Sequence, residues 1–482
     1  MISPHHFHPT NGVRPSDSMP ISRRSFVAAA GAAAAGCVLP SFASNRGSSR
    51  WYKGMLHAHT LWSDGCVLPE QAVKAYKDAG YDFISVTDHN RIGSEPDRWM
   101  KVAPPAGEWP PVSVAPEVFE AFRRVFPDAP WRERAGVREV KVSTIRETYA
   151  RFNEPGRFLC LPGCELTTNV FMPDGSWRDL HVNYIGLNEL IPCARTAGLV
   201  YETRGETVAR TIGAAKAQLD ALARERGGVP NVFFVNHPHW RYSDVLPRDI
   251  VENPDVRFFE VCNNGSSWAP VPPLPADGFF CDRFWDAVNA VRCLRGDPLL
   301  YGIATDDSHG YPGCGLPAST YTFGDGWIGV RAGALRAADL FAAMEKGDFY
   351  AASGVDFDDI AFDRVKGRLT VSVPAKTGVS HVVRFITTKR GADTELRSVA
   401  LPADGRRQPR EAPVFSDTVG RVVKSVSFAP GEAVFASYTL ASDDLYVRAR
   451  VESSEPTVYR HKNRMHPVMK TGWTQPFRPG RV

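Results

Sequence analysis

The 482-residue sequence has few of the features that mark membrane-spanning, nucleic-acid-binding or disulfide-stabilised proteins. Its 57 basic and 53 acidic residues leave a formal net charge of +4, and they form no long basic run and no charged low-complexity tail. No nucleic-acid partner is therefore expected. A hydrophobic content of 43% and a charged content of 23% are ordinary for a globular protein, and the length favours two domains.

Cysteine is also scarce, because nine cysteines cannot form a disulfide framework at this length. Cys160 and Cys164 are close enough in sequence to act as a metal pair. No second cysteine pair and no following histidine complete a tetrahedral set around them. Buried, reduced cysteines are expected.

The N-terminus resembles a twin-arginine export signal. Arg23 and Arg24 precede an alanine-rich apolar run from Val27 to Leu39, and Ser41-Phe42-Ala43 offers a small-x-small cleavage site. The run is shorter and less apolar than the roughly 20 residues of a membrane span, so no stable membrane anchor is expected. We expect residues 1–43 to be a signal peptide recognised by the twin-arginine machinery of a bacterium, which places the mature protein in the periplasm or medium. Lipidation of Cys37 stays open.

The polar residues that follow two apolar runs indicate where a functional site lies. Met55 and Leu56 lead into His57 and His59, which face the same side of a strand because side chains alternate along it. A second run, Phe83 to Val86, leads into Asp88 and His89. Two strands that end in such groups predict a parallel β/α architecture with its site at the carboxyl ends of the strands.

The remaining chain extends this pattern. About seven apolar strands alternate with helices and predict a distorted parallel (β/α)7-type barrel over residues 51–355, with an insertion at 91–142 that serves as a lid or substrate wall. Short β-type segments then predict a small antiparallel β-sandwich domain over residues 356–482. The main expected helices are 69–80, 118–126, 145–152, 206–226, 284–294 and 335–346, and the main expected strands are 158–161, 180–186, 231–235, 256–262, 300–304, 369–373, 381–388, 422–428, 433–440 and 445–451.

Nine ionisable residues lie near the ends of these expected strands. They are His57, His59, Asp64, His89, Glu165, His181, His237, Asp307 and His309. Burying so many ionisable groups costs several kcal/mol each unless something compensates them. Divalent cations provide that compensation, and mixed nitrogen and oxygen ligands favour Zn, Mn or Fe over Ca. The number of ligands implies two or three ions. A structural role stays open for two of these residues, since His181 alone suits a buried core histidine and Asp64 suits a turn or helix cap.

These motifs, in this order, resemble the polymerase-and-histidinol-phosphatase (PHP) metallohydrolases. The resemblance rests on His57-x-His59, Ser63-Asp64-Gly65, Thr87-Asp88-His89, Glu165, His237-Pro238 and Asp307-x-His309. The C-terminal segment, with Tyr446-Val447-Arg448 and Trp473-Thr474-Gln475-Pro476, resembles the β-domain of an exported branch that includes carbaryl-hydrolase-like proteins. One departure is an inserted Phe-Met-Pro-Asp-Gly-Ser-Trp turn between Glu165 and His181, which makes His181 the least secure ligand.

The resemblance implies a site of three ions. His57, His59 and Asp307 would hold the first, and Glu165 would bridge it to a second. His181 and His237 would complete the second ion's shell, and Asp64, His89 and His309 would hold the third. Asp306 is a candidate proton donor to the leaving group, and His239 is a candidate for touching substrate or supporting His237. Arg91 and Arg241 are candidates for a phosphate pocket or, equally, ordinary surface arginines.

The expected activity is metal-dependent hydrolysis, most simply of a small phosphate ester or nucleotide, in which a water that bridges two cations loses a proton and attacks. The same metals would serve a carboxylic or carbamate ester hydrolase. A third hypothesis is a non-catalytic protein whose sandwich binds a surface or polymer ligand. The sequence identifies neither the natural substrate nor the oligomeric state.

Overall fold

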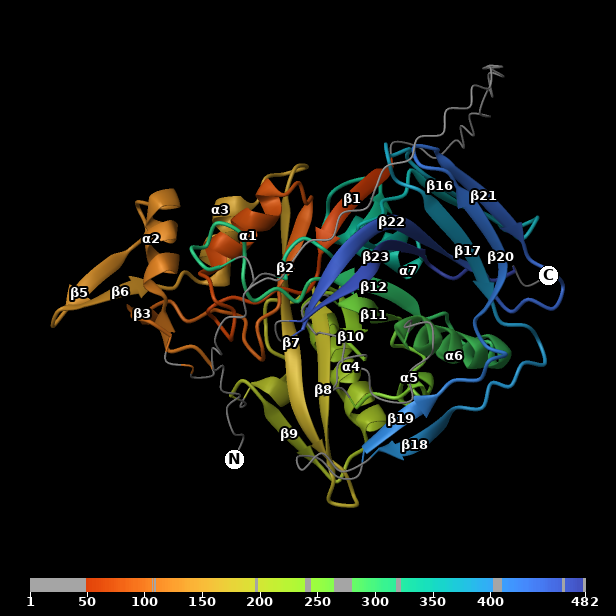
Figure 1. Cartoon of the computed structure of the whole chain (residues 1–482). Helices are drawn as coiled ribbons and strands as arrows, with labels where there is room; N and C mark the ends of the chain where they lie inside the picture. The colour runs from red at the N-terminus through yellow and green to blue at the C-terminus, as the bar shows by residue number, and fades with distance from the viewer. Residues whose placement is uncertain are drawn as a thin grey trace, which may run out of the picture.

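The computed structural model describes residues 49–105, 107, 110–195, 198–238, 244–263, 280–317, 322–401, 410–461 and 464–479, which form a mixed α/β protein rich in strands (Figure 1). The expected signal peptide, Cys37, His239 and Arg241 lie outside these ranges. The helices are α1 (Pro69–Asp78), α2 (Pro116–Val125), α3 (Ile145–Phe152), α4 (Val208–Glu225), α5 (Pro247–Val251), α6 (Phe280–Arg295) and α7 (Ala337–Glu345), with a 3-10 turn η1 (Pro192–Ala194). None of the helices in these ranges combines the length and apolarity needed to span a bilayer.

One sheet of fourteen strands organises the molecule. Its strands are β1 (Arg50–Met55), β2 (Phe83–Val86), β7 (Leu159–Phe171), β8 (Trp177–Ile185), β9 (Tyr201–Arg204), β10 (Val232–Val235), β11 (Phe258–Asn263), β12 (Tyr301–Thr305), β13 (Trp327–Ala332), β14 (Phe349–Ser353), β17 (His381–Thr387), β20 (Arg421–Phe428), β22 (Arg448–His461) and β23 (Arg464–Thr474). They follow the path β12-β11-β10-β8-β7-β2-β1-β13-β14-β23-β22-β17-β20, and β9 pairs with β7 beside it.

The sheet is parallel in two runs, β1-β2-β7 and β10-β11-β12. β8 runs antiparallel to both of its neighbours, and so do β13 and β14. The expected parallel arrangement therefore holds for the strands with the strongest apolar runs, since β2, β10 and β12 are buried at every position. It does not hold for the three antiparallel strands.

The hydrogen-bonded path has two ends, so the described strands do not form a closed barrel. β12, at one end, nevertheless lies beside β13 and β14. The side-chain amide of Gln475 reaches this edge, where it accepts a hydrogen bond from the Gly302 backbone N–H and donates one to the Gly302 carbonyl, each 2.8 Å long. One buried glutamine thus takes the place of a strand at this point on the edge of β12. The mixed α/β class is as expected, whereas the ring of strands stays open.

Local sequence explains the helices that pack against the sheet. In α1, Pro69 occupies the first turn, and Ala72, Val73 and Tyr76 form the buried face. α3 begins with a reciprocal cap, in which the Thr144 hydroxyl accepts from the Glu147 N–H at 3.1 Å and the Glu147 carboxylate accepts from the Thr144 N–H at 2.7 Å. Both helices lie within one residue or two of their predicted bounds.

The strand after α3 is far longer than predicted. β7 has 13 residues and forms an antiparallel hairpin with the nine-residue β8, in which Thr167 pairs with His181 and Phe171 with Trp177. The inserted turn that separates Glu165 from His181 in sequence forms the tip of this hairpin, where Met172 N–H donates to the Ser176 carbonyl at 2.7 Å. The insertion therefore lengthens the hairpin instead of displacing His181 from Glu165.

The insertion at 91–142 projects to the left in Figure 1. Its helix α2 was predicted, but its four-stranded sheet β4-β3-β6-β5 was not. Those strands are β3 (Trp99–Val102), β4 (Ser113–Val114), β5 (Trp131–Arg134) and β6 (Val137–Lys141). Val118, Phe119 and Phe122 of α2 join the same hydrophobic cluster as α1, so the insertion is anchored to the body of the molecule.

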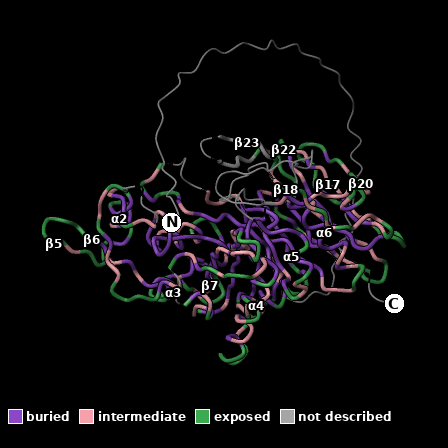
Figure 2. Tube along the Cα trace, turned by 90° about the horizontal axis from the view of Figure 1, so that it is seen from below, coloured by how far each residue is buried: buried purple, intermediate pink, exposed green. Residues whose placement is uncertain are grey.

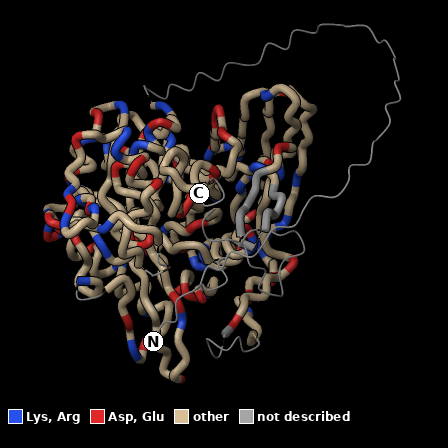
Figure 3. The backbone as a smooth tube through the Cα atoms, turned by 60° about the vertical axis from the view of Figure 1, so that its left-hand side comes forward, with Lys and Arg blue, Asp and Glu red and all other residues tan. Residues whose placement is uncertain are grey.

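The C-terminal part is antiparallel, as expected. β15 (Asp359–Asp363), β16 (Arg368–Val373) and β21 (Val434–Thr439) form one sheet, and β18 (Arg397–Leu401) pairs with β19 (Arg410–Val414). β17, β20, β22 and β23 belong instead to the large sheet, which continues into them through the pairing of β14 with β23. Buried residues run through the middle of the traced chain (Figure 2). Basic and acidic residues are interspersed along it, as the nearly balanced composition implies (Figure 3).

A buried ionic network joins helix α6 to strand β22. Arg448 donates to both Asp286 oxygens, at 2.6 and 2.9 Å, and to Asp282 at 2.8 Å. Tyr446 also donates to Asp286, at 2.7 Å, and Arg450 to Asp282, at 3.2 Å. Burial alone would lower the pKa of Arg448, but Asp286 and Asp282 outweigh it and raise that pKa. The network ties the C-terminal strands to a helix that follows β11.

Candidate metal centre

The nine predicted ligands come from seven segments that the large sheet brings together. His57 and His59 follow β1, His89 follows β2, His237 follows β10, and Asp307 and His309 follow β12. Glu165 lies in β7, His181 lies in β8, and Asp64 lies in the turn after His59. Isolated bridges between Ala58 and Ser308 and between His89 and Glu165 continue the pairing beyond the strand ends. These bridges hold the polar segments side by side.

Four buried residues form the centre of the cluster: His57, His59, Glu165 and Asp307. The nitrogen His59 Nε2 lies 2.9 Å from Asp307 Oδ1 and 3.1 Å from Glu165 Oε2. His57 Nε2 lies 3.2 Å from the same Glu165 oxygen and 3.3 Å from Asp307 Oδ1. One ligand atom from each residue lies within 4.8 Å of the others, so the group is able to hold a metal ion.

A second group lies on the more open side and contains His59, Asp64, His89 and His309. Asp64 Oδ2 lies 3.4 Å from His89 Nε2 and 3.3 Å from His309 Nε2. The rings of His59 and His309 stack with their centroids 4.3 Å apart. The side chain of His309 is 36% exposed, whereas that of His59 is 0% exposed, so solvent reaches the cluster from the His309 side.

A third group contains His89, Glu165 and His181, with His237 beside it. His89 Nδ1 lies 3.0 Å from Glu165 Oε2, and His181 Nδ1 lies 2.9 Å from Glu165 Oε1. His237 Nε2 is 3.5 Å from the same Oε1. The structure therefore brings all nine predicted residues together around Glu165. The grouping differs from the implied one in that His59 belongs to two groups, His89 shares a group with His181, and His237 belongs to none of the three.

The imidazole and carboxylate groups of the cluster shift each other's pKa values in opposite directions. Burial lowers the pKa of His57, but Asp307, Glu165 and Glu260 outweigh it and hold that pKa well above its usual value. Burial likewise raises the pKa of Glu165, but His89, His57 and His181 hold it well below its usual range. The carboxylates are therefore ionised and attract positive charge. Divalent cations supply such charge, and their binding displaces the imidazole protons.

The surroundings of one oxygen support the fit of these residues to a cation. Glu165 Oε2 is fully buried and accepts no well-formed hydrogen bond from the described residues. Three imidazole nitrogens, of His57, His59 and His89, nevertheless lie 3.0 to 3.2 Å from it. A buried carboxylate oxygen without a hydrogen bond is costly unless another group compensates it. Imidazole nitrogens and carboxylate oxygens that converge in this way are able to hold a metal ion.

The turn that carries Asp64 is organised by Asp88, whose role the sequence did not reveal. The Asp88 carboxylate accepts from the Thr60 N–H at 2.8 Å and from the hydroxyls of Thr60 and Ser63 at 2.7 and 2.6 Å. Gly65 closes the turn, because a Cβ there would lie 2.5 Å from the Thr60 nitrogen. Asp88 thus holds the turn between the candidate ligands His59 and Asp64 in place without belonging to a ligand group.

Two further supporting residues were also missed. Glu260 of β11 accepts from His57 Nδ1 at 2.7 Å, and Asn236 donates to Glu165 Oε1 at 2.7 Å. The signal for Glu260 was present, since it is the single charged residue in the run Phe-Phe-Glu-Val-Cys-Asn of a fully buried strand. Asn236 offered a weaker signal, as the residue before the expected ligand His237.

Backbone strain concentrates at this site. Asn90, His237 and Asp307 have φ values of 46°, 26° and 49°, and Ala135 is the one other non-glycine residue with positive φ in the described ranges. Such conformations cost about 1–3 kcal/mol each and persist where the surroundings impose them. Asn90 is held by hydrogen bonds from its amide to the carbonyls of Thr167 and Leu199, each 2.9 Å long.

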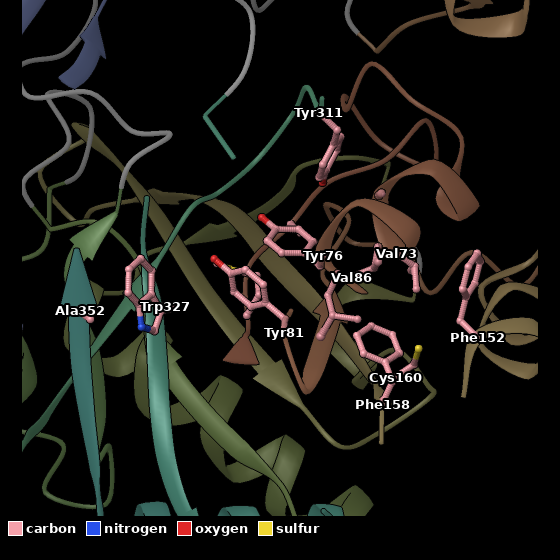
Figure 4. Close-up of a cluster of buried hydrophobic side chains, with 14 of the residues drawn as sticks. Val73, Tyr76, Tyr81, Val86, Phe152, Phe158, Cys160, Tyr311, Trp327 and Ala352 are labelled. Carbon is pink, nitrogen blue, oxygen red and sulfur yellow. The ribbon is translucent and has the colours of Figure 1, made fainter. Parts of the chain in front are cut away.

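Of the four residues expected to act on substrate, Asp306 and Arg91 lie in the described ranges. Asp306 is buried and accepts hydrogen bonds from Tyr76 and from the backbone N–H groups of residues 324–326, and burial raises its pKa to about 7. Tyr76 lies in the aromatic cluster of Figure 4 with Tyr311, whose hydroxyl donates to the His59 carbonyl at 2.8 Å. Arg91 is 32% exposed and lies 3.2 Å from Glu95. His239 lies outside the described residues.

No protein-family model and no curated protein matches the chain. Solved structures that resemble it include a two-domain protein from Bacteroides vulgatus described as containing a predicted PHP-like metal-dependent phosphoesterase, at 14% identity and a TM-score of 0.37, with 88% of this chain and 96% of the other covered. A putative metal-dependent phosphoesterase from Bifidobacterium adolescentis matches at 12% identity and 0.27, over 55% and 89% of the two chains. An amidohydrolase from Chromobacterium violaceum, solved with bound sulfate and no metal, matches at 14% and 0.27, over 56% and 89%.

Proposed function

We propose that this protein is a metal-dependent hydrolase of the PHP type, and most simply a phosphoesterase that acts on a small phosphate ester or nucleotide. The observation that supports it best is the position of Glu165 Oε2, buried among three imidazole nitrogens at 3.0 to 3.2 Å. The order of the ligand motifs along the chain supports the same assignment.

In this proposal the three groups of ligands would hold two or three divalent ions, of Zn, Mn or Fe. Bound divalent cations would supply the Lewis acidity that activates water and offsets charge developing on the ester. The protein orients the ligands: His89 Nδ1 lies 2.6 Å from the Thr167 hydroxyl, and His309 Nδ1 lies 2.9 Å from the Asp307 carbonyl. These contacts leave the Nε2 atom of each ring facing Asp64.

The candidate catalytic residues take different roles in the proposal. Asp306 is a positioning residue, because its carboxylate anchors the backbone of residues 324–326 beside the segment that carries Asp307. Arg91 is the described candidate for contact with a substrate phosphate, since its partly exposed side chain follows Asn90 directly. His239 remains a candidate for contact with substrate.

We also propose that residues 51–355 form the hydrolase unit as an open, barrel-like sheet, and that residues 356–482 form a sandwich-like extension of the exported carbaryl-hydrolase-like type. Leu369 and Val371 of β16 and Val383 and Phe385 of β17 share one hydrophobic cluster, which supports face-to-face packing of the two C-terminal sheets. Residues 1–43 would direct export through the twin-arginine machinery to the periplasm or medium.

A substrate panel with defined metals tests the proposal. Purified protein is stripped with a chelator, reloaded with Mn or Zn, and assayed on an aryl phosphate monoester, a bis-aryl phosphodiester and an aryl carboxylic or carbamate ester. We expect metal-dependent cleavage of a phosphate ester, and loss of that activity in Asp307→Ala. Preferential cleavage of the carboxylic or carbamate ester would assign the alternative hydrolase. A protein that binds no metal and cleaves none of the esters would be a non-catalytic binding protein.

A further inference from the structure

Glu260 is a fully buried carboxylate that lies outside the three groups of candidate ligands. It occupies the middle of β11, between Phe259 and Val261 in an otherwise apolar run. A carboxylate in such a strand requires partners that justify its burial. The role inferred for it rests on the proposed metal-binding function and concerns how that site is held.

Four donors meet the two oxygens of Glu260. Oε1 accepts from the Thr305 hydroxyl at 2.6 Å and lies 2.7 Å from His57 Nδ1. Oε2 accepts from the His237 backbone N–H at 2.8 Å and from the Asn263 amide at 2.7 Å. A carboxylate has about four lone-pair positions, so these contacts use its full capacity. Glu260 thus connects the segments that follow β1 and β10 with the last residue of β12.

This contact decides which nitrogen of His57 faces the cluster. Because Glu260 Oε1 lies 2.7 Å from His57 Nδ1 and a carboxylate oxygen accepts hydrogen bonds, we place the proton of the neutral His57 ring on Nδ1, from which it is donated to Glu260. In the neutral ring, the Nε2 lone pair then points toward Glu165 Oε2 and Asp307 Oδ1, which lie 3.2 and 3.3 Å away. The nearest oxygens to Nδ1 of His89 and His309 are instead the Thr167 hydroxyl at 2.6 Å and the Asp307 carbonyl at 2.9 Å, although Glu165 Oε2 also lies 3.0 Å from His89 Nδ1. A carboxylate partner makes an imidazole a stronger metal ligand than a neutral partner does.

The second oxygen of Glu260 acts on another candidate ligand. His237 has a φ of 26°, a strained value for a residue with a side chain, and its N–H points to Glu260. Without this acceptor the strained turn would lose the hydrogen bond that compensates it. Glu260 therefore controls the ring of His57 and the backbone of His237 at once.

We propose that Glu260 is a positioning residue that fixes His57 and His237 for metal binding, so that it sets the affinity of the site for the ion that His57 holds. The change that tests this is Glu260→Gln. A glutamine offers one acceptor oxygen and one NH2 group, so it cannot accept from both His57 and His237. Its NH2 group must face one of these two donors.

The matched control is Glu70→Gln. Glu70 is also a buried glutamate, 3% exposed, but it lies on α1 and accepts from the Ser143 hydroxyl, outside the ligand groups. Parent, variant and control are stripped, reloaded with Zn or Co(II), and passed through a desalting column. We then measure ions bound per chain, the affinity in competition with a chromogenic chelator, and the visible absorption of bound Co(II).

We expect Glu260→Gln to bind one ion about 10–100-fold more weakly, to lose roughly one ion per chain on the column, and to change the Co(II) spectrum. Glu70→Gln should match the parent in all three measurements. A purely structural role for Glu260 would change the thermal stability of the stripped protein while leaving the Co(II) spectrum of the reloaded protein unchanged. That result would overturn the inference.

Should Glu260→Gln fail to fold, Thr305→Val removes one hydrogen bond to Oε1 while conserving shape, and we expect a roughly two- to tenfold loss of affinity. Parent-like affinity and spectrum in the folded variant would overturn the inference while leaving the proposed hydrolase intact. A parent protein that binds no ion under any loading condition would overturn both.

Discussion

The buried network of Arg448 provides a quantitative test of how the C-terminal strands are attached. We consider Arg448→Met, which keeps an apolar chain of similar length and removes the guanidinium. Asp286 would lose two hydrogen bonds, of 2.6 and 2.9 Å, and keep the one from Tyr446 at 2.7 Å. Asp282 would lose one bond of 2.8 Å and keep those from Arg450 and Trp473, both 3.2 Å.

The magnitude follows from leaving the buried Asp286 carboxylate without its ion-pair partner. Removing one partner of a buried ion pair costs about 3–5 kcal/mol. An unfolding entropy of about 2.1 cal/mol/K per residue amounts to roughly 0.8 kcal/mol/K for a folded unit of about 400 residues, so the Tm should fall by about 4–6 °C. Thermal unfolding followed by circular dichroism or calorimetry measures the shift.

Two further variants make the measurement decisive. Arg397→Met removes an arginine that is 46% exposed and pairs with Asp393 and Glu395, and it should shift the Tm by less than about 1 °C. The double variant Arg448→Met with Asp286→Leu removes the unpaired charge and should recover much of the loss. If Arg448→Met alone left the Tm within about 1 °C of the parent, the network would not contribute to the attachment and the reasoning would be refuted.

Three other predictions concern the site and its surroundings. His57→Ala and Asp307→Ala should each abolish metal-dependent turnover while far-UV circular dichroism stays unchanged; retained activity in both would contradict the proposed site. Removing metal with a chelator should lower the Tm by about 5 °C relative to protein holding an ion at about 1,000 times its Kd, and an unchanged Tm would indicate that no ion was bound. Burial raises the pKa of Asp249 to about 7, so the folded state binds its proton more tightly than the unfolded state, and its charge costs stability as pH rises from about 4 through 7. Asp249→Asn should therefore raise the Tm most at pH 8, less at pH 5 and little at pH 4, and an equal effect at all three values would count against the titration.

Sequence patterns predicted the parallel core because burial dictates composition there. β2, β10 and β12 are short apolar runs that end in polar residues, and their bounds match the prediction to within about one residue. The helices α1 and α3 were predicted as well, and in the structure they begin at a proline in the first turn and at a capping box on Thr144. In each case one local interaction determines the element.

The insertion sheet and the open edge of β12 could not be predicted by these means. β5 has the sequence Trp-Arg-Glu-Arg, with none of its residues buried, so no alternation of apolar and polar residues marks it as a strand. The edge at Gly302 depends on Gln475, a contact between residues 173 positions apart. Long-range pairing of this kind leaves no periodic signal in either segment.

The candidate ligands were predictable because strand ends converge, but their supporting residues were not. Asp88 and Glu260 make no contact that spacing would reveal, because their partners include residues after β1 and the last residue of β12. A charged residue inside an apolar strand is nevertheless a usable sign. Burial there requires a specific partner, and in this protein that partner is a candidate ligand.

His181 shows how an apparent weakness in the sequence reflects the geometry of a hairpin. In the β7–β8 pairing Glu165 lies opposite Asn183 and Thr167 opposite His181, so all four side chains point to one face of the sheet. The Thr167 hydroxyl contacts the candidate ligand His89, and the Asn183 side chain accepts a hydrogen bond from Asn236, which also donates to Glu165. Adding two residues to each strand, or lengthening the turn between them, leaves that face unchanged. Whether a hairpin residue reaches the site therefore depends on which face of the strand its side chain occupies. The number of residues between it and its partner in the sequence does not decide whether the two side chains meet.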